Sequence, residues 1–301
     1  MLRPVHFVGM LLALALALPV GADAPTRIVA IGAAISETVV ALGAADALVA
    51  VDSGSRHPAL LQDLPQLGYH RALGAEGVLS MEPDHVLTVA SAGPPVILRQ
   101  VEAAGVRMTR IDDLPDPRAV PAKILAVGEA IGREQEAEEL AAAVASEIDA
   151  VLADALPGEP PRVLFLLSVR DGAPMASGRD TAAAAMIEAV GARNALSGFS
   201  GYRPLSMEAA LRAEPDVILV MEQTLERVGG VDVLVGMPAL RHTPAGRCRC
   251  VVAMEGTLLL SFGPRTALAI TRLRDALRAS GEAGGAQIVS TETRGISPLE
   301  P

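Results

Sequence analysis

Aromatic residues are scarce in this sequence, which has 2 Tyr, 4 Phe and no Trp among 301 residues. So few rings disfavour base-stacking platforms, sugar-stacking clefts and aromatic cages for quaternary amines. Two cysteines cannot build a disulfide framework. Basic residues are outnumbered, 25 Lys and Arg against 35 Asp and Glu, and the formal net charge of -10 makes duplex nucleic acid an unfavourable partner. Disorder is excluded as well, because 50% of the residues are hydrophobic and only 20% are charged.

The first 22 residues have the pattern of a secretory signal peptide. Arg3 supplies a positive charge, residues 7–18 are almost wholly apolar, and small residues precede Asp23. An apolar run of this length is short for a membrane span, so we expect cleavage between Ala22 and Asp23. An uncleaved membrane anchor is the alternative. No cysteine lies near the cleavage site, so the sequence does not indicate a lipid anchor, and we expect an exported, acidic protein.

Short apolar runs alternate with helical patterns along the rest of the chain. The runs lie at 26–31, 48–52, 84–89 and 106–111, and after Gly158 at 162–167, 216–221 and 250–254. Strands that alternate with helices form mainly parallel sheets covered on both faces. The sequence therefore predicts an α/β fold.

An internal repeat divides this fold into two halves. Residues 76–87 align without gaps on residues 208–219, and Glu, Leu, Glu, Pro, Asp and Leu coincide. Each stretch is typical of a short helix ended by Pro, with Asp leading into a buried strand. The repeat predicts two Rossmann-like lobes of one architecture.

One long helix is expected between the lobes. Residues 134–156 contain no Gly or Pro, and Leu140, Val144, Ile148 and Val151 form an apolar stripe at helical spacing. At about 1.5 Å per residue this helix would span roughly 35 Å. The expected organisation is a signal peptide at 1–22, an N-terminal lobe at 23–133, the connecting helix at 134–156, a C-terminal lobe at 157–280 and a flexible tail at 281–301.

The sequence has no Walker A loop, no G-x-S-x-G motif and no G-x-G-x-x-G motif, so common catalytic motifs are missing. Cys248 and Cys250 are two residues apart, so on a strand both thiols would point to one face. They could be surface thiols, form a local disulfide or bind a soft metal. A metal site would need His57 and His70 to meet. Neither pattern predicts catalysis strongly.

The most informative segment surrounds one of the two tyrosines, Tyr69, in a predicted loop. A phenolate is a hard anionic ligand suited to ferric iron, and tyrosine is an axial ligand of haem. A free phenol has a pKa near 10, so the phenolate needs the iron and a nearby cation, which Arg71 could supply. The alternative is a tyrosine packed against its own loop beside a solvated arginine.

Several segments together resemble one family. In the N-terminal half they are RIVAIG at 27–32, Glu37, the Leu-Gly pair at 42–43, GYHRAL at 68–73, AEGVLS at 75–80 and the Pro-Asp pair at 83–84. In the C-terminal half they are GRDT at 178–181, the Gly-Gly pair at 229–230 and FGPRT at 262–266. With them the chain resembles the periplasmic haem-binding proteins of bacterial ABC importers over residues 27–277. The GYHRAL segment is the part most specific to haem binders.

The resemblance implies roles for particular residues. Tyr69 falls at the position of the axial iron ligand, Arg71 at that of the arginine bonded to it, and Glu76 and Glu208 at those of the glutamates that dock onto permease arginines. Tyr202 and Met175 are further candidates for haem contact. Three arginines are candidates for pairing with the haem propionates, namely Arg179, Arg227 and Arg265. Residues 169–175 lack the histidine that lets some members bind two stacked haems.

The implied protein is not an enzyme. It would be a periplasmic monomer that captures ferric haem and passes it to an ABC permease with its ATPase, downstream of an outer-membrane haem receptor. A cobalamin or ferric-siderophore binder of the same fold is the first alternative. An exported redox or haem-handling enzyme that uses Cys248 and Cys250 is the second.

Overall fold

The N-terminal lobe is built on a parallel sheet in the order β2-β1-β3-β4. The computed structural model describes residues 26–154, 156, 158–170, 172–283 and 287–289. Every residue of β1 is buried, which is expected of a central strand covered on both faces. The elements of this lobe are β1 (Ile28–Ile31), α1 (Ala33–Ala41), η1 (Ala45–Ala47), β2 (Leu48–Val51), η2 (Ala59–Asp63), α2 (Ala75–Leu79), β3 (His85–Val89), α3 (Pro95–Ala103), β4 (Arg107–Ile111), η3 (Pro117–Ala119) and α4 (Val120–Ile131).

The C-terminal lobe has a larger, mixed sheet in the order β11-β10-β9-β5-β6-β8, with β7 paired to β5. The strands β11, β10, β9 and β5 are parallel, whereas β6 pairs antiparallel with both β5 and β8. The elements are β5 (Arg162–Arg170), β6 (Ala173–Ser177), α6 (Ala182–Ala189), β7 (Arg193–Asn194), β8 (Tyr202–Pro204), α7 (Met207–Ala213), β9 (Val217–Met221), α8 (Glu222–Val228), α9 (Val231–Gly236), α10 (Pro244–Cys248), β10 (Val251–Met254), α11 (Gly256–Leu260), α12 (Thr266–Ala283) and β11 (Gln287–Val289).

The internal repeat corresponds to equivalent turns in the two lobes. Glu82 and Glu214, each directly before Pro, both adopt left-handed backbone angles, with φ of 47° and 42°. The Asp that follows Pro accepts a backbone N–H from the start of the lobe's first strand. Asp84 accepts from Arg27 at 3.1 Å, and Asp216 accepts from Arg162 at 2.8 Å. The repeated residues therefore belong to a helix–turn–strand unit that occurs once in each lobe.

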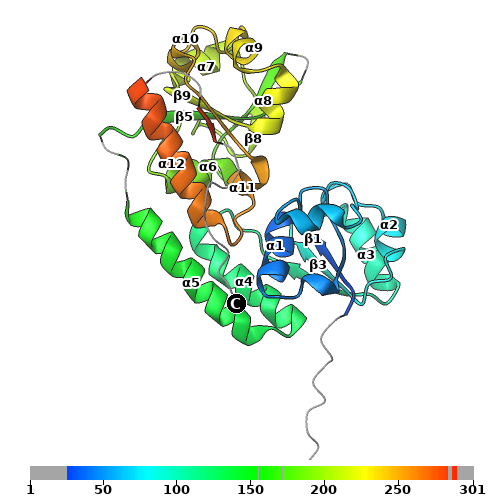
Figure 1. Ribbon diagram of the computed structural model, residues 1–301. Helices are drawn as coiled ribbons and strands as arrows, with labels where there is room; N and C mark the ends of the chain where they lie inside the picture. The colour runs from blue at the N-terminus through cyan, green and yellow to red at the C-terminus, as the bar shows by residue number, and fades with distance from the viewer. Residues whose placement is uncertain (1–25, 155, 157, 171, 284–286, 290–301) are drawn as a thin grey trace, which may run out of the picture.

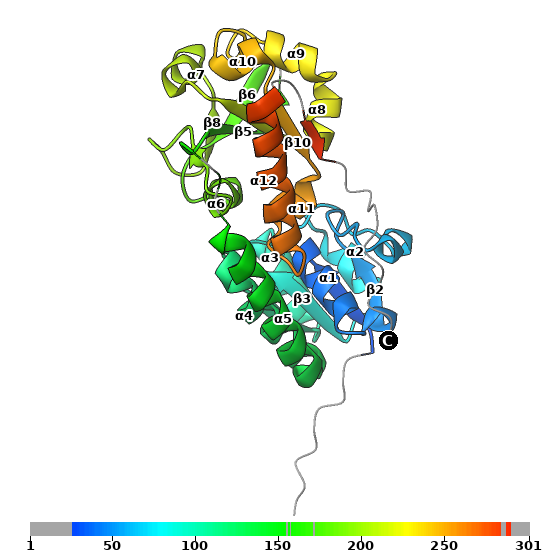
Figure 2. The same cartoon turned by 60° about the vertical axis from the view of Figure 1, so that its left-hand side comes forward.

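Two helices join the lobes. The long helix α5 (Glu134–Ala153) ends three residues before the expected boundary at 156, because Asp154 is extended and its carboxylate pairs with arginines of α12. Arg274 of α12 also donates to the Val151 carbonyl oxygen at 2.6 Å. Figures 1 and 2 show α5 beside α4 at the N-terminal lobe and α12 against the C-terminal lobe, with the two helices meeting near the end of α5. One apolar core runs through this junction, from Ile28 of β1 through Ile148 of α5 to Phe165 of β5.

The predicted α/β fold with two mainly parallel sheets is confirmed. The end of the chain differs from the loose tail expected from 281 on, because β11 pairs in parallel with β10, Val252 opposite Gln287. The signal peptide expected at 1–22 and most of the expected tail lie outside the described residues. Over the described part of the chain, no helix has both the length and the apolarity needed to cross a membrane.

Candidate functional site

The loop that carries Tyr69 is fixed by backbone hydrogen bonds on both sides. Before it, Leu67 donates to the Val51 carbonyl of β2 at 2.9 Å, and Ser53 donates to the Gly68 carbonyl at 2.8 Å. After it, the backbone N–H of Gly93 donates to the His70 carbonyl at 2.9 Å. The side chain of Tyr69 itself is 52% exposed. The loop therefore holds its backbone rigid and presents the phenol at the surface.

The neighbours of Tyr69 form a polar group at the carboxyl end of β2. The rings of Tyr69 and His70 lie 4.4 Å apart, and His70 Nδ1 is 3.9 Å from Asp52 Oδ2. Burial lowers the pKa of His70, and the Asp52 carboxylate acts in the opposite direction. Asp52 is buried and accepts hydrogen bonds from Gly32 N, Gly54 N and Ser55 Oγ at 2.9, 3.0 and 2.6 Å. His70 is thus anchored to the interior of the lobe.

Tyr202 approaches this group from the C-terminal lobe. It lies at the start of β8, and burial raises its pKa. Hydrogen bonding from Thr181 and the charge of Arg71 act to lower that pKa, while Tyr69 acts to raise it. Arg71 and Tyr69, both of the N-terminal lobe, therefore act electrostatically on Tyr202 of the C-terminal lobe.

The other predicted haem contacts are dispersed over the C-terminal lobe. Met175, on β6, pairs with Pro204, and Ser177 of the same strand pairs with Tyr202, so Met175 and Tyr202 share one face of the sheet. Met175 is half-buried. Arg179 is exposed just beyond β6, and Arg227 is exposed in the last turn of α8.

Arg265 has a partner inside the protein. Its Nε and Nη2 donate to the two carboxylate oxygens of Glu37 on α1, at 2.9 and 2.5 Å. A haem propionate at Arg265 would have to compete with this carboxylate. Sequence reasoning gave no role to Glu37 or to the buried Lys123 of α4. The available signal was a charged residue among the mostly apolar residues of each helix.

The two glutamates expected to dock onto a permease lie on the equivalent helices α2 and α7 of the two lobes, which Figure 1 labels. Glu76 is in the first turn of α2 and Glu208 in the first turn of α7, and both are exposed. Arg212, one turn further along α7, donates to Glu208 at 2.5 Å. Met207 and Leu211 of α7 are exposed beside this pair.

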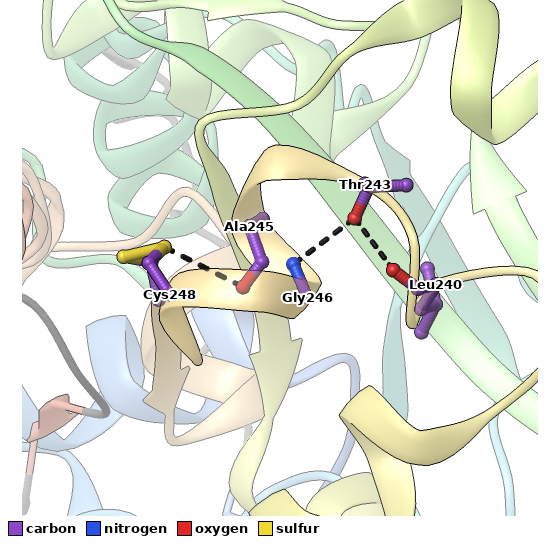
Figure 3. The surroundings of a disulfide bond; sticks show 6 residues. Leu240, Thr243, Ala245, Gly246 and Cys248 are labelled. Atoms are coloured by element: carbon purple, nitrogen blue, oxygen red, sulfur yellow. Dashed lines mark hydrogen bonds between the residues drawn. A yellow bond between two sulfur atoms is a disulfide. The ribbon is translucent and has the colours of Figure 1, made fainter.

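Cys248 and Cys250 form a disulfide, which is one of the alternatives left by the sequence. The expected placement of both residues on a strand is wrong. Cys248 ends α10, Arg249 adopts left-handed angles with φ of 60°, and Cys250 precedes β10. Figure 3 shows this turn, in which the Thr243 hydroxyl accepts from the Gly246 N–H at 3.0 Å and Cys248 Sγ lies 3.6 Å from the Ala245 carbonyl oxygen. The helix end folds the chain back and brings the two Cα atoms within 5.2 Å.

The structure gives no support to a metal site at the histidines. Burial lowers the pKa of His57, and so does the charge of Arg265, whereas the charge of Glu255 raises it. His70 is instead directed to Asp52. Among the described residues, no three or more His, Cys, Asp or Glu side chains are grouped so that they could hold a metal ion.

Comparison with known proteins gives consistent matches. The sequence profile of the family described as periplasmic binding protein matches residues 28–257. An uncharacterised ABC transporter substrate-binding lipoprotein of Bacillus subtilis (strain 168), YvrC, is 25% identical over 202 residues, which cover 66% of this chain and 64% of the lipoprotein. The match therefore spans slightly less than two thirds of that relative.

Two solved structures are similar over most of this chain. The apo form of the periplasmic heme-binding protein RhuT from Roseiflexus sp. RS-1 is 41% identical, with a TM-score of 0.82, over 87% of this chain and 100% of that one. The periplasmic heme-binding protein BhuT in complex with two hemes is 42% identical, with a TM-score of 0.80, over 83% of this chain and 97% of that one.

Proposed function

We propose that this chain, which belongs to the periplasmic binding protein family, captures ferric haem between its lobes and delivers it to an ABC permease. The observation that carries the proposal is the exposed phenol of Tyr69, two residues before Arg71, with both residues acting electrostatically on Tyr202 of the other lobe. Its support from similarity is that RhuT and BhuT, at 41% and 42% identity, are heme-binding proteins.

Tyr69 is the better candidate of the two tyrosines for binding iron. Its loop fixes the backbone while about half of the side chain stays accessible. An iron ligand must lose the phenol proton, and a nearby guanidinium such as that of Arg71 favours the anionic form. Burial raises the pKa of Tyr202, which keeps this second phenol protonated. We therefore assign Tyr69 to the iron, Arg71 to its phenolate, and Tyr202 to a neutral contact with the ligand.

The remaining contacts follow from placement on the C-terminal lobe. Met175 shares a sheet face with Tyr202 and is proposed to cover the second side of the macrocycle. Arg179 and Arg227 are exposed and are proposed partners of the propionates, since guanidinium groups bind carboxylates in pairs of hydrogen bonds. We propose Arg265 only as a weaker partner, because Glu37 already occupies its donors.

Delivery would use the two exposed glutamates. Glu76 and Glu208 occur once on each lobe, so a permease with two basic sites can hold both lobes at once. We propose that transport is powered by the separate ATPase of the importer, and that the protein itself catalyses no reaction. We further propose a monomer in the periplasm, exported by a signal peptide at 1–22 and supplied by an outer-membrane haem receptor.

Titration of the purified protein with hemin tests the proposal. We expect the Soret band of hemin to shift on binding, Tyr69→Ala to weaken binding strongly, and the matched variant Tyr202→Ala to weaken it far less. Equal losses in both variants would contradict the assignment of Tyr69. Cobalamin and a ferric siderophore serve as competing ligands, and a protein that binds either of them and ignores hemin belongs to the alternative class.

A further inference from the structure

The disulfide between Cys248 and Cys250 closes a loop that has a single residue between its two ends. A cross-link over so short a loop removes little entropy from the unfolded chain, so it adds little to the stability of the fold. Its two ends belong to different elements, because Cys248 ends α10 and Cys250 directly precedes β10. Opening this disulfide would therefore leave the fold intact.

Backbone hydrogen bonds hold both ends of the loop in place without help from the sulfur atoms. The Cys250 N–H donates to the Ala245 carbonyl oxygen at 3.0 Å, and the Cys250 carbonyl oxygen accepts from Ile218 of β9 at 2.9 Å. The hydroxyl of Thr243 caps α10 by accepting from the Gly246 N–H at 3.0 Å (Figure 3). The two Cα atoms lie 5.2 Å apart, a separation at which a disulfide can form. Reduction would thus leave two thiols that are still held within bonding reach.

The two cysteines differ in their exposure. Cys248 is exposed, whereas Cys250 is 7% exposed. Thiol–disulfide exchange begins when a thiolate attacks a sulfur atom that it can reach. The difference in exposure therefore directs an incoming thiolate to Cys248 and makes Cys250 the leaving group. The described part of the chain has no free cysteine, so none of its own thiols competes in this exchange.

Positive charge lies beside this disulfide on a protein whose formal net charge is -10. Arg247 and Arg249 flank the first cysteine in the sequence. Asp232 of α9 pairs with Arg249, whereas Arg241 and Arg247 donate to a ring nitrogen and to the carbonyl oxygen of His242, at 3.0 and 2.5 Å. Nearby guanidinium groups favour a thiolate over a thiol, both for the attacking sulfur and for the sulfur that leaves.

We propose that Cys248 and Cys250 form a redox site that exchanges with a protein dithiol, an activity that goes beyond haem capture and does not rest on it. A thiolate of the dithiol forms a bond to Cys248 Sγ, the disulfide breaks, and Cys250 Sγ leaves with the electron pair and takes up a proton from water. The second thiol of the partner then loses its proton, attacks the partner's sulfur in the mixed disulfide and displaces Cys248. The chain gains two electrons and two protons, and the partner becomes a disulfide.

The fixed spacing of the two cysteines makes the site selective for dithiols over monothiols. After attack by a monothiol, Cys250 stays within reach of the mixed disulfide on Cys248 and expels the incoming group by reclosing the loop. A dithiol resolves the same mixed disulfide through its own second thiol, so the reduction goes to completion.

Reduced thioredoxin serves as the probe dithiol for the purified, folded protein. We expect it to reduce the disulfide without denaturant, which alkylation of two new thiols followed by mass spectrometry records. With a thioredoxin that has lost its resolving cysteine, N-ethylmaleimide added during the exchange should label Cys250, and peptide mapping should find the thioredoxin on Cys248. Attachment at Cys250, or reduction that occurs only after urea unfolds the chain, would overturn the proposal.

Two small thiols of opposite charge, mercaptoethanesulfonate and cysteamine, test the basic surroundings of the site. Their rates are calculated per thiolate and divided by the rates with the uncharged hydroxyethyl disulfide. At low salt the anionic thiol should be favoured by about threefold or more, and about 0.5 M salt should remove most of this preference. Arg247→Gln should reduce the preference, whereas the matched variant Arg118→Gln, exposed on the N-terminal lobe, should retain it. Equal rates for the two thiols in the unchanged protein would overturn the proposal.

Discussion

The buried histidine His85 should make the stability of the ligand-free protein depend on pH. His85 begins β3, is fully buried, and its Nε2 lies 2.8 Å from Thr109 Oγ1. Burial lowers the pKa of His85 from 6.5 to about 4, and the charge of Arg107 on the neighbouring strand adds to the decrease. The backbone of Ala130 acts weakly in the opposite direction.

The sign follows from proton uptake. Below pH 6.5 the unfolded chain binds a proton at His85, whereas the folded protein does not bind it until the pH nears 4. The contribution of His85 to the free energy of unfolding is therefore complete above the pKa of the unfolded chain, and it is lost as the pH falls from 6.5 to about 4. The difference between the two pKa values corresponds to about 3 kcal/mol of unfolding free energy.

Urea unfolding followed by far-ultraviolet circular dichroism measures this loss, because the chain has no Trp for fluorescence. Between pH 6.5 and about 4, we expect the free energy of unfolding to fall by about 3 kcal/mol less in the double variant His85→Val with Thr109→Val than in the unchanged protein. Replacing both partners avoids an unsatisfied hydroxyl. Thr109→Val alone retains His85 and should keep the original pH dependence. An unchanged slope in the double variant would refute the reasoning.

Three further predictions concern the surface of the C-terminal lobe. Ser206→Ala should cost about 1 kcal/mol in thermal unfolding, because the Ser206 hydroxyl caps α7, and no loss would contradict this role. Arg212→Ala should raise the apparent affinity for the permease complex up to about fivefold, because it frees Glu208 from its ion pair, and stimulation of the permease ATPase measures this affinity. Glu208→Ala should lower the same affinity. A decrease in both variants would argue against competition between Arg212 and the permease for Glu208. Replacing Cys248 and Cys250 by Ser should cost about 1.5 kcal/mol or less, since the disulfide closes a very short loop, and should leave hemin titration unchanged; lost hemin binding would contradict this.

Local signals made much of the fold predictable. The Pro and Asp of the internal repeat act within a few residues, so residues 76–87 and 208–219 could be assigned to equivalent units. The long helix α5 was recognisable from its composition, and only its end differed, because Asp154 is held by Arg274 and Arg278 of α12. The strand β11 was missed, because it has only three residues and its pairing with β10 is not visible in the local sequence.

The site was less predictable where it depends on packing between the lobes. Tyr69 and Arg71 are two residues apart, so the sequence alone is enough to propose that they act together. The junction is different, because Arg265 meets Glu37 across 228 residues and Lys123 meets Phe262 across 139. No local pattern indicates such pairs, so the sequence alone does not show that Glu37 is a partner of Arg265.

The absorption spectrum of the hemin complex of Tyr69→Phe tests the central claim most directly, since this substitution removes only the phenolic oxygen. We predict that the unchanged protein shows the charge-transfer absorption of a ferric phenolate, and that Tyr69→Phe lacks it while Tyr202→Phe retains it. A phenolate band that persists in Tyr69→Phe would show that the iron is bound elsewhere and would contradict the account.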